Sequence, residues 1–157
     1  MTERDFRSAF DDHKGAVYNF ALRLTGSAAT AEDLAQDCFL LLLRHPGRFD
    51  ASRGTLRAFL LGVVRKLAMR RWREEQRLEP LDDDPRTEAP GDIGLLVGAA
   101  VRSLPPLQRE AVLLFEYEGF TLEEIARTVE ADVGTVKSRL HRARERLRHL
   151  LAPLRTR

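Results

Sequence analysis

The stretch TLEEIARTVEADVGTVKSRLHRARERL, residues 121–147, carries the patterns of two amphipathic helices joined by a tight turn. Thr121 and Glu124 have the spacing of a capping box that starts a short helix, and Asp132 can cap the longer helix that follows. Apolar residues of the longer helix recur at spacings of three and four, at Val133, Val136, Leu140, Ala143, Leu147 and Leu150. That period predicts one buried stripe with the charged residues turned outward. A short helix, a turn and a longer basic helix form a helix-turn-helix arrangement.

The side of the longer helix opposite its apolar stripe is polar and basic. It carries Lys137, Ser138, His141 and Arg142, and Glu145 is the only acidic residue after Asp132. Gly134 and Thr135 leave the start of the helix uncrowded, so a phosphate could approach its free N–H groups. Lys and Arg side chains here can donate hydrogen bonds to guanine edges or phosphates in a major groove. This pattern favours DNA binding over a merely solvated basic face.

The distribution of charge says more than the net charge. The chain has 157 residues, with 26 basic and 24 acidic side chains. Residues 51–73 contain no acid, residues 77–94 hold six acids against two Arg, and residues 133–157 are again basic. Two basic helices on either side of an acidic connector are typical of a protein that contacts polyanions at two separate places.

Several classes of protein are disfavoured by what the sequence lacks. A single Cys excludes an intramolecular disulfide and a cysteine-rich zinc site, and it suits a reducing compartment. The first residues are charged throughout, unlike a signal peptide, and no apolar run is long enough for a membrane span. There is no phosphate-binding glycine loop, no dinucleotide motif and no His pair at ligand spacing. We therefore expect a cytoplasmic protein without membrane insertion, enzymatic activity, cofactor or metal.

The rest of the chain also reads as helices, which makes the fold class all-α. A first helix is marked by Phe6, Phe10, Val17, Phe20 and Leu24 and ends at Gly26. A second covers TAEDLAQDCFLLLLR, with Thr30 and Asp33 as a capping pair and HPG as its stop. A third runs from about residue 55 to 73 with an apolar stripe of Leu56, Phe59, Leu60, Val63 and Leu67.

The acidic segment divides the chain into two parts. Residues 76–94 carry several Pro and no apolar period, which is typical of an exposed linker that a protease would cut. We therefore expect one small domain over residues 1–75 and another over residues 95–157. The second would contain a weak helix interrupted by glycines, a helix opening at Pro106 and closing at Gly119, and the helix-turn-helix.

Two further faces have more than one interpretation from the residues alone. The third helix carries Arg65, Lys66, Arg70, Arg71 and Arg73 beside Trp72, and Arg53 precedes it. Basic residues with an exposed aromatic ring suit single-stranded nucleic acid, but Trp72 could equally pack on the linker. The second helix carries Asp33, Gln36 and Asp37 opposite its apolar side. Such an acidic face either meets solvent or binds a basic partner, and Cys38 is interpreted as core.

Taken in order, the segments AEDLAQDCFL, RFDASRGTLRAFLLGVVRKLA, LPPLQREAVLL and GFTLEEIA…VGTVKSRLHRARERL resemble a bacterial extracytoplasmic-function (ECF) sigma factor of the sigma-70 family. The resemblance covers nearly the whole chain. It implies a region 2 domain and a region 4 domain joined by a flexible linker, which together direct core RNA polymerase to a promoter. It also implies contact with the clamp helices of the largest subunit and the flap of the second-largest subunit, and control by a separate anti-sigma factor.

The resemblance also implies roles for individual residues. Asp33, Gln36 and Asp37 would contact the clamp helices. Residues 49–73 would open and read the −10 element as a single strand, with Arg53, Arg65, Lys66, Arg70 and Trp72 as contacts. Thr135, Lys137, Ser138, His141 and Arg142 would read the −35 element in the duplex.

The chain departs from the family pattern at a few positions. Lys66 and Phe59 stand where Asn and Trp are frequent, Leu41 and Leu43 fall in a usually more polar run, and Glu130 and Ala131 replace the usual Gly and apolar residue of the turn. Two other classes compete with this interpretation. A plain helix-turn-helix regulator would leave the first domain without a function, and a sigma mimic that only sequesters an anti-sigma factor would not need a basic outer face on its last helix.

Overall fold

The computed structural model describes residues 1–78 and 93–153, and these residues form helices and turns without a strand. The all-α prediction is therefore confirmed. The chain divides into an N-terminal unit, Met1–Arg73, and a C-terminal unit, Glu74–Arg157. Most of the predicted linker lies outside the described residues. At its two ends, α3 continues to Leu78 and α4 begins at Ile93, so the helices extend a little into the span expected for the linker.

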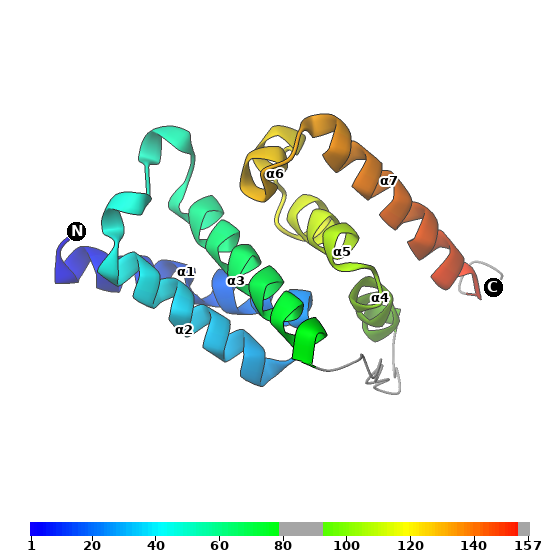
Figure 1. Cartoon of the computed structure of the whole chain (residues 1–157), viewed down its shortest axis with the longest axis horizontal. Helices are drawn as coiled ribbons and strands as arrows, with labels where there is room; N and C mark the ends of the chain where they lie inside the picture. Colours follow the sequence, from blue (N-terminus) through cyan, green and yellow to red (C-terminus); the bar gives the residue numbers. More distant parts are fainter. Residues whose placement is uncertain (79–92, 154–157) are drawn as a thin grey trace. The chain divides into compact units, whose positions relative to one another are not determined.

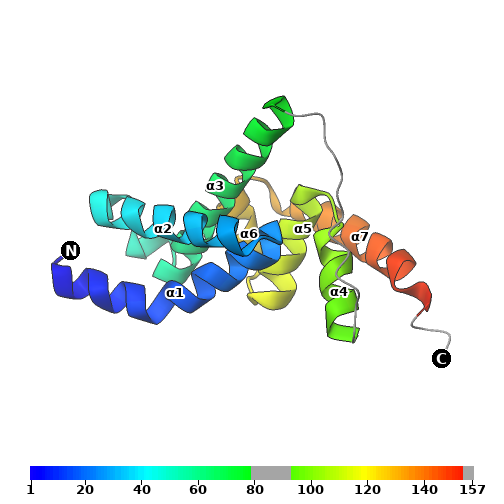
Figure 2. The ribbon, with the colours of Figure 1, turned by 90° about the horizontal axis from the view of Figure 1, so that it is seen from below.

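The N-terminal unit contains α1 (Glu3–Thr25), α2 (Ala28–Arg44) and most of α3 (Leu56–Leu78), with two short 3₁₀ turns at Pro46–Arg48 and Ala51–Arg53. Successive helices run in opposite directions, as Figure 1 shows, and Figure 2 gives the view from below. Thr2 and Asp5 form a capping box at the start of α1. Gly26 ends α1 in the left-handed conformation (φ 73°), as predicted, because glycine adopts positive φ without a Cβ penalty.

The start of α2 differs from the prediction. Its N-cap is Ser27, whose side chain accepts a hydrogen bond from the backbone N–H of Thr30 at 3.2 Å. The predicted capping pair of Thr30 and Asp33 is therefore wrong. Both residues lie inside the helix, and Asp33 is left free to bond elsewhere. The stop after Arg44, before Pro46, is as expected.

The side of α3 that faces the core also differs from the predicted one. The side chains with the least exposure are Leu60, Leu61, Val64 and Ala68, whereas Phe59 remains half-buried. Apolar residues surround much of the first turns of this helix, so its period alone does not fix which side faces the core. Packing on α2 decides it, where the Cys38 thiol donates to the carbonyl of Leu60 at 3.4 Å. Phe59 instead contacts Phe49 of the preceding loop, with ring centroids 5.6 Å apart.

The C-terminal unit contains α4 (Ile93–Arg102), α5 (Pro106–Val112), α6 (Leu122–Val129) and α7 (Val133–Leu150). Pro106 opens α5, as predicted from the preference of proline for the first helical turn. The helix then widens into a π-helical segment, Leu113–Tyr117, which the sequence pattern does not reveal. Gly119 closes it with φ 73°.

The core of this unit lies where α5, α6 and α7 meet. Its most buried side chains are Leu104, Leu113, Leu114, Ile125, Val136, Leu140 and Ala143. The predicted capping box of α6 is present, with Thr121 accepting from Glu124 N–H and Glu124 accepting from Thr121 N–H, both at 3.1 Å. Asp132 caps α7 by accepting from Thr135 N–H at 2.7 Å, as expected. The helix-turn-helix predicted from the sequence is therefore confirmed.

Candidate nucleic-acid and polymerase interface

The outward face of α7 is built by its buried stripe. Val136, Leu140 and Ala143 are buried, so the residues on the other side of the helix face solvent. Lys137, Ser138, His141 and Arg142 are all exposed, and Thr135 in the first turn is half-buried. The structure thus brings the five predicted duplex-reading residues together on the first turns of one helix. This is the part of a recognition helix that contacts base edges in helix-turn-helix proteins.

The start of α7 has a fixed negative charge at its cap. The backbone N–H and the side chain of Thr135 hydrogen-bond to Asp132, and these bonds lower the pKa of its carboxyl from the ordinary value. The Asp132 carboxylate accepts from one of the free backbone N–H groups at the start of the helix, so a phosphate would bind to the N–H groups that remain.

One acid lies on the outward face of α7 itself. Glu145 is exposed one turn beyond His141, and its Oε1 lies 3.2 Å from His141 Nε2. The outward face is therefore purely basic only over its first turns. Because a carboxylate repels phosphates, Glu145 disfavours contact with a duplex backbone at its own position.

A second basic side chain of α7 contacts the protein rather than the open surface. The Arg144 guanidinium lies 3.4 Å from Glu116 Oε1 and 5.4 Å from the ring centroid of Phe115. Both partners belong to the π-helical segment, Leu113–Tyr117. Arg144 therefore helps to hold α7 against the π-helical segment that follows α5. Arg148, one turn further along, is exposed.

The residues predicted to contact a single strand are spread along α3 and the loop before it. Lys66, Arg70 and Arg73 share one exposed side of the helix at spacings of four and three. Arg65 and Trp72 are seven residues apart on a different side, where Trp72 is 41% exposed. The structure thus brings these predicted contacts onto the same helix but not onto one face.

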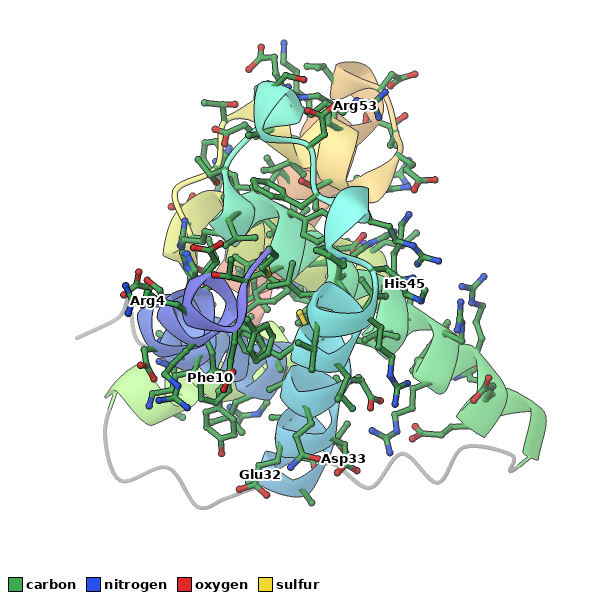
Figure 3. All side chains as sticks on the ribbon, turned by 90° about the vertical axis from the view of Figure 1, so that its left-hand side faces the viewer. Arg4, Phe10, Glu32, Asp33, His45 and Arg53 are labelled. Carbon is green, nitrogen blue, oxygen red and sulfur yellow. The ribbon has the colours of Figure 1, made fainter. Side chains whose placement is uncertain are left out.

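Arg53 lies on the loop between α2 and α3, at the opposite end of α2 from Asp33, as Figure 3 shows. The Arg53 Nε lies 3.8 Å from Asp50 Oδ2. Asp50 also accepts from the hydroxyl of Ser52 at 2.7 Å and from Ser52 N–H at 2.9 Å, and these bonds lower the pKa of its carboxyl. This loop is shaped by its own short-range hydrogen bonds. Thr55 then caps α3 by accepting from Ala58 N–H at 3.1 Å.

The acidic face of α2 is exposed, as predicted. Asp33, Gln36 and Asp37 all lie at the surface on the first half of the helix. The same side continues with two exposed apolar residues, Leu40 (42%) and Leu43 (52%), at helical spacing from Gln36. The face is thus acidic at one end and apolar at the other. The sequence-based prediction included only the acidic half of this face. The unbroken run of leucines at residues 40–43 already indicated that apolar side chains would lie on more than one side of the helix.

One contact links two of the predicted sites directly. Arg71 Nη2 of α3 donates to Asp33 Oδ2 of α2 at 3.3 Å. Arg71 is thereby separated from its basic neighbours on α3 and tied to the acidic face of α2. No sequence spacing indicates this pair, because the two residues are 38 positions apart.

The described residues hold no group of three or more His, Cys, Asp or Glu side chains placed to bind a metal ion. Within the same residues, no helix has the length and apolar character that crossing a bilayer requires. What the structure does present is a helix-turn-helix with a basic outer face, and a separate helical unit with a basic and an acidic surface.

Comparison with known proteins identifies both units. Residues 9–78 match the sigma-70 region 2 family, and residues 95–147 match the sigma-70 region 4 family. The ECF RNA polymerase sigma factor SigE of Mycolicibacterium smegmatis is 36% identical over 154 residues, which cover 89% of this chain and 59% of SigE. The ECF sigma factor SigL of Mycobacterium tuberculosis is 31% identical over 158 residues, covering 94% of this chain and 89% of SigL.

Solved structures agree with this assignment. The sigma factor RpoE from Bartonella quintana, crystallised with the anti-sigma factor NepR, is 28% identical with a TM-score of 0.78, over 95% of this chain and 98% of that one. CnrH, solved with the cytosolic domain of CnrY, is 25% identical with a TM-score of 0.72, over 97% and 90% of the two chains. The fold and the basic helix-turn-helix define a DNA-binding transcription protein. The chain belongs to the ECF sigma factors of the sigma-70 family.

Proposed function

We propose that this chain directs core RNA polymerase to specific promoters and starts transcription there. The observation that carries the proposal is the presence, in one chain, of region 2 and region 4 matches on two folded units, each with a charged surface suited to its partner. The protein would act as a transcription factor in the cytoplasm rather than as an enzyme. A plain helix-turn-helix regulator would need only the C-terminal unit.

The C-terminal unit would hold the duplex. Lys137, Ser138, His141 and Arg142 reach outward from the first turns of α7, and Thr135 lies beside the helix start. In this proposal they read the −35 element in the major groove, where Arg and Lys donors match guanine acceptors. The same unit would also bind the flap of the second-largest polymerase subunit.

The N-terminal unit would hold the melted strand and the core enzyme. Along α3 and its loop, Arg53, Arg65, Lys66 and Arg70 supply positive charge, and Trp72 supplies an exposed ring for stacking on a base. On α2, Asp33, Gln36 and Asp37 would contact the clamp helices of the largest subunit. Leu40 and Leu43 on the same side would add apolar area to that contact.

A separate anti-sigma factor would control the protein. The similar solved structure of the Bartonella quintana factor contains the anti-sigma factor NepR, and that of CnrH contains the cytosolic domain of a second protein, CnrY. A protein bound over either charged surface would block promoter recognition by competition.

Run-off transcription with purified core polymerase tests the proposal. The chain should support initiation from its own promoter, whereas core alone should not. The two variants are Lys137→Ala, on the outward face of α7, and Arg7→Ala, which removes an exposed basic side chain from α1. Lys137→Ala should reduce initiation and Arg7→Ala should not. Binding to promoter DNA without any initiation would favour the plain regulator instead.

A further inference from the structure

The ion pair between Arg71 and Asp33 joins two surfaces that are proposed to bind different partners. Asp33 belongs to the acidic face of α2, proposed to bind the polymerase clamp. Arg71 stands between Arg70 and Trp72 on α3, in the segment proposed to hold single-stranded DNA. Their side chains lie 3.3 Å apart, and both remain partly exposed, at 39% for Arg71 and 58% for Asp33. A competing cation or anion could therefore reach either member.

Neighbouring charges are not tied in this way. Asp37, one turn further along α2, and Arg73, two residues beyond Arg71, form no ion pair with another residue of the described chain. Both are exposed. The pairing is thus a property of this one acid and this one base, and not of the two surfaces in general.

We propose that Arg71 is a coupling residue that exchanges partners when core polymerase binds. In the free protein its guanidinium neutralises Asp33. A cationic side chain of the polymerase then takes over the Asp33 carboxylate, and the released guanidinium becomes an additional contact for the phosphates of the melted strand. The inference rests on the proposed function, because both partners come from it.

The strength of the contact permits the exchange. Partly exposed ion pairs contribute little to stability because water and salt screen them, so opening this pair should reduce the affinity for core by no more than about fivefold. On the DNA side, one phosphate contact with a single strand changes the salt dependence by about 0.7 in the slope of log K against log [salt]. Through the Arg71 side chain, polymerase binding would thereby raise the affinity for the open strand. By reciprocity, binding of DNA would raise the affinity for polymerase.

The test compares Arg71→Gln with Arg73→Gln, which removes the same charge from a residue that is not paired with Asp33. Circular dichroism checks that both fold, as is expected for exposed positions. Affinity for core is measured by fluorescence anisotropy of the labelled full chain. Arg71→Gln should bind core up to about fivefold more tightly because Asp33 is already free, whereas Arg73→Gln should stay close to wild type. In the holoenzyme, binding of a −10 single strand should lose about 0.7 of its salt slope with Arg71→Gln.

Asp33→Asn completes the cycle and separates this inference from the proposed function. In that background, Arg71→Gln should no longer change the affinity for core. If Asp33→Asn leaves core binding unchanged, the clamp face itself is wrong and the exchange falls with it. In a second outcome, Asp33→Asn weakens core binding while Arg71→Gln gives no gain in affinity for core, or the same gain as Arg73→Gln. That result would support the proposed clamp-binding role of α2 and overturn only the exchange of partners by Arg71.

Discussion

Cys38 shows how burial alone sets the chemistry of a side chain. Its thiol is buried between α2 and α3 and donates to the Leu60 carbonyl, and desolvation raises its pKa from the ordinary value of a thiol to about 12. Since the thiolate is the reactive form, this cysteine should be inert in the folded protein. The sequence-based assignment of Cys38 to the core is consistent with this environment.

A measurable consequence is resistance to alkylation. At pH 8, iodoacetamide should label Cys38 only after denaturation, as followed by mass spectrometry. Above pH 9 the unfolded state can ionise the thiol while the folded state cannot until about pH 12, so stability should fall as the pH rises through that window. Cys38→Ala should lose this part of the pH dependence. Rapid labelling of the native protein would contradict the buried position.

We expect Arg142 and Arg148 to separate base reading from phosphate contact on α7. Arg142 is exposed among the first turns, and Arg148 is exposed near the far end, beyond Glu145. Arg142→Ala should cost about 1–3 kcal/mol of binding and relax the preference at one −35 base pair. Arg148→Ala should weaken all sequences alike and lower the salt slope by about one.

The measurement is holoenzyme binding over a library of −35 variants at several salt concentrations. If both substitutions shift every variant by the same factor, Arg142 is a phosphate contact, and discrimination lies with Lys137, Ser138 or His141. Arg144 is a poorer candidate for either role than its position in the sequence indicates, because Glu116 and Phe115 already hold its guanidinium.

Single residues of the sites could be predicted from the sequence where exposure follows helical periodicity. Lys137, His141 and Arg142 lie opposite a regular apolar stripe, so their exposure follows from spacing alone. The tie between Asp33 and Arg71, and that between Arg144 and Glu116, depend on how separate helices pack. Packing brings together residues that no local pattern relates.

At the scale of single helices, the short helix-turn-helix segment was the most predictable. Its caps at Thr121 and Asp132 are local hydrogen bonds between residues three positions apart, and such bonds can be read from a sequence. The start of α2 was not, because Ser27 and Thr30 are both residue types that can serve as N-caps, and the structure uses the earlier one. The buried side of α3 and the π-helical turn after α5 likewise depend on neighbours.

The capping box of α6 should be measurable as stability of the C-terminal unit. Thr121→Ala removes the hydroxyl that accepts from Glu124 N–H and should cost about 1 kcal/mol in the free energy of unfolding. Thr128→Ala is the matched control in the same helix. Its hydroxyl donates to the Glu124 carbonyl, a bond that adds little to a helix. Urea unfolding of residues 93–157 should show the larger loss for Thr121→Ala, and equal losses would contradict the capping role.

For the molecule as a whole, the two units have separate cores. Phe20, Leu42 and Leu60 are fully buried in the N-terminal unit, and Leu104 and Ile125 are among the most buried residues of the C-terminal one. The pattern of amphipathic helices on either side of an acidic stretch predicted this division, because each set of apolar stripes needs partners to cover it. The details of the contact with polymerase could not be predicted in the same way, since they depend on a second molecule.

Each unit should therefore fold when produced alone. Fragments 1–78 and 93–157 should both be helical by circular dichroism and unfold cooperatively on heating. Ile125→Ala should destabilise the second fragment by about 2–5 kcal/mol, because it leaves a cavity in that core. A fragment that stays unstructured at moderate temperature would show that its core is incomplete without the rest of the chain.

A substitution in the turn between α6 and α7 should make the protein more stable. Glu130 there has φ 55°, the one residue other than glycine with a positive φ in the described chain. A side chain costs about 1–2 kcal/mol in this conformation, whereas glycine adopts it freely. Glu130→Gly should thus raise the melting temperature of the C-terminal unit while the outward residues of α7 keep their positions. Such a variant would tolerate damaging substitutions on the recognition helix that the natural chain would not survive, which makes it a suitable starting scaffold for selecting altered promoter preferences.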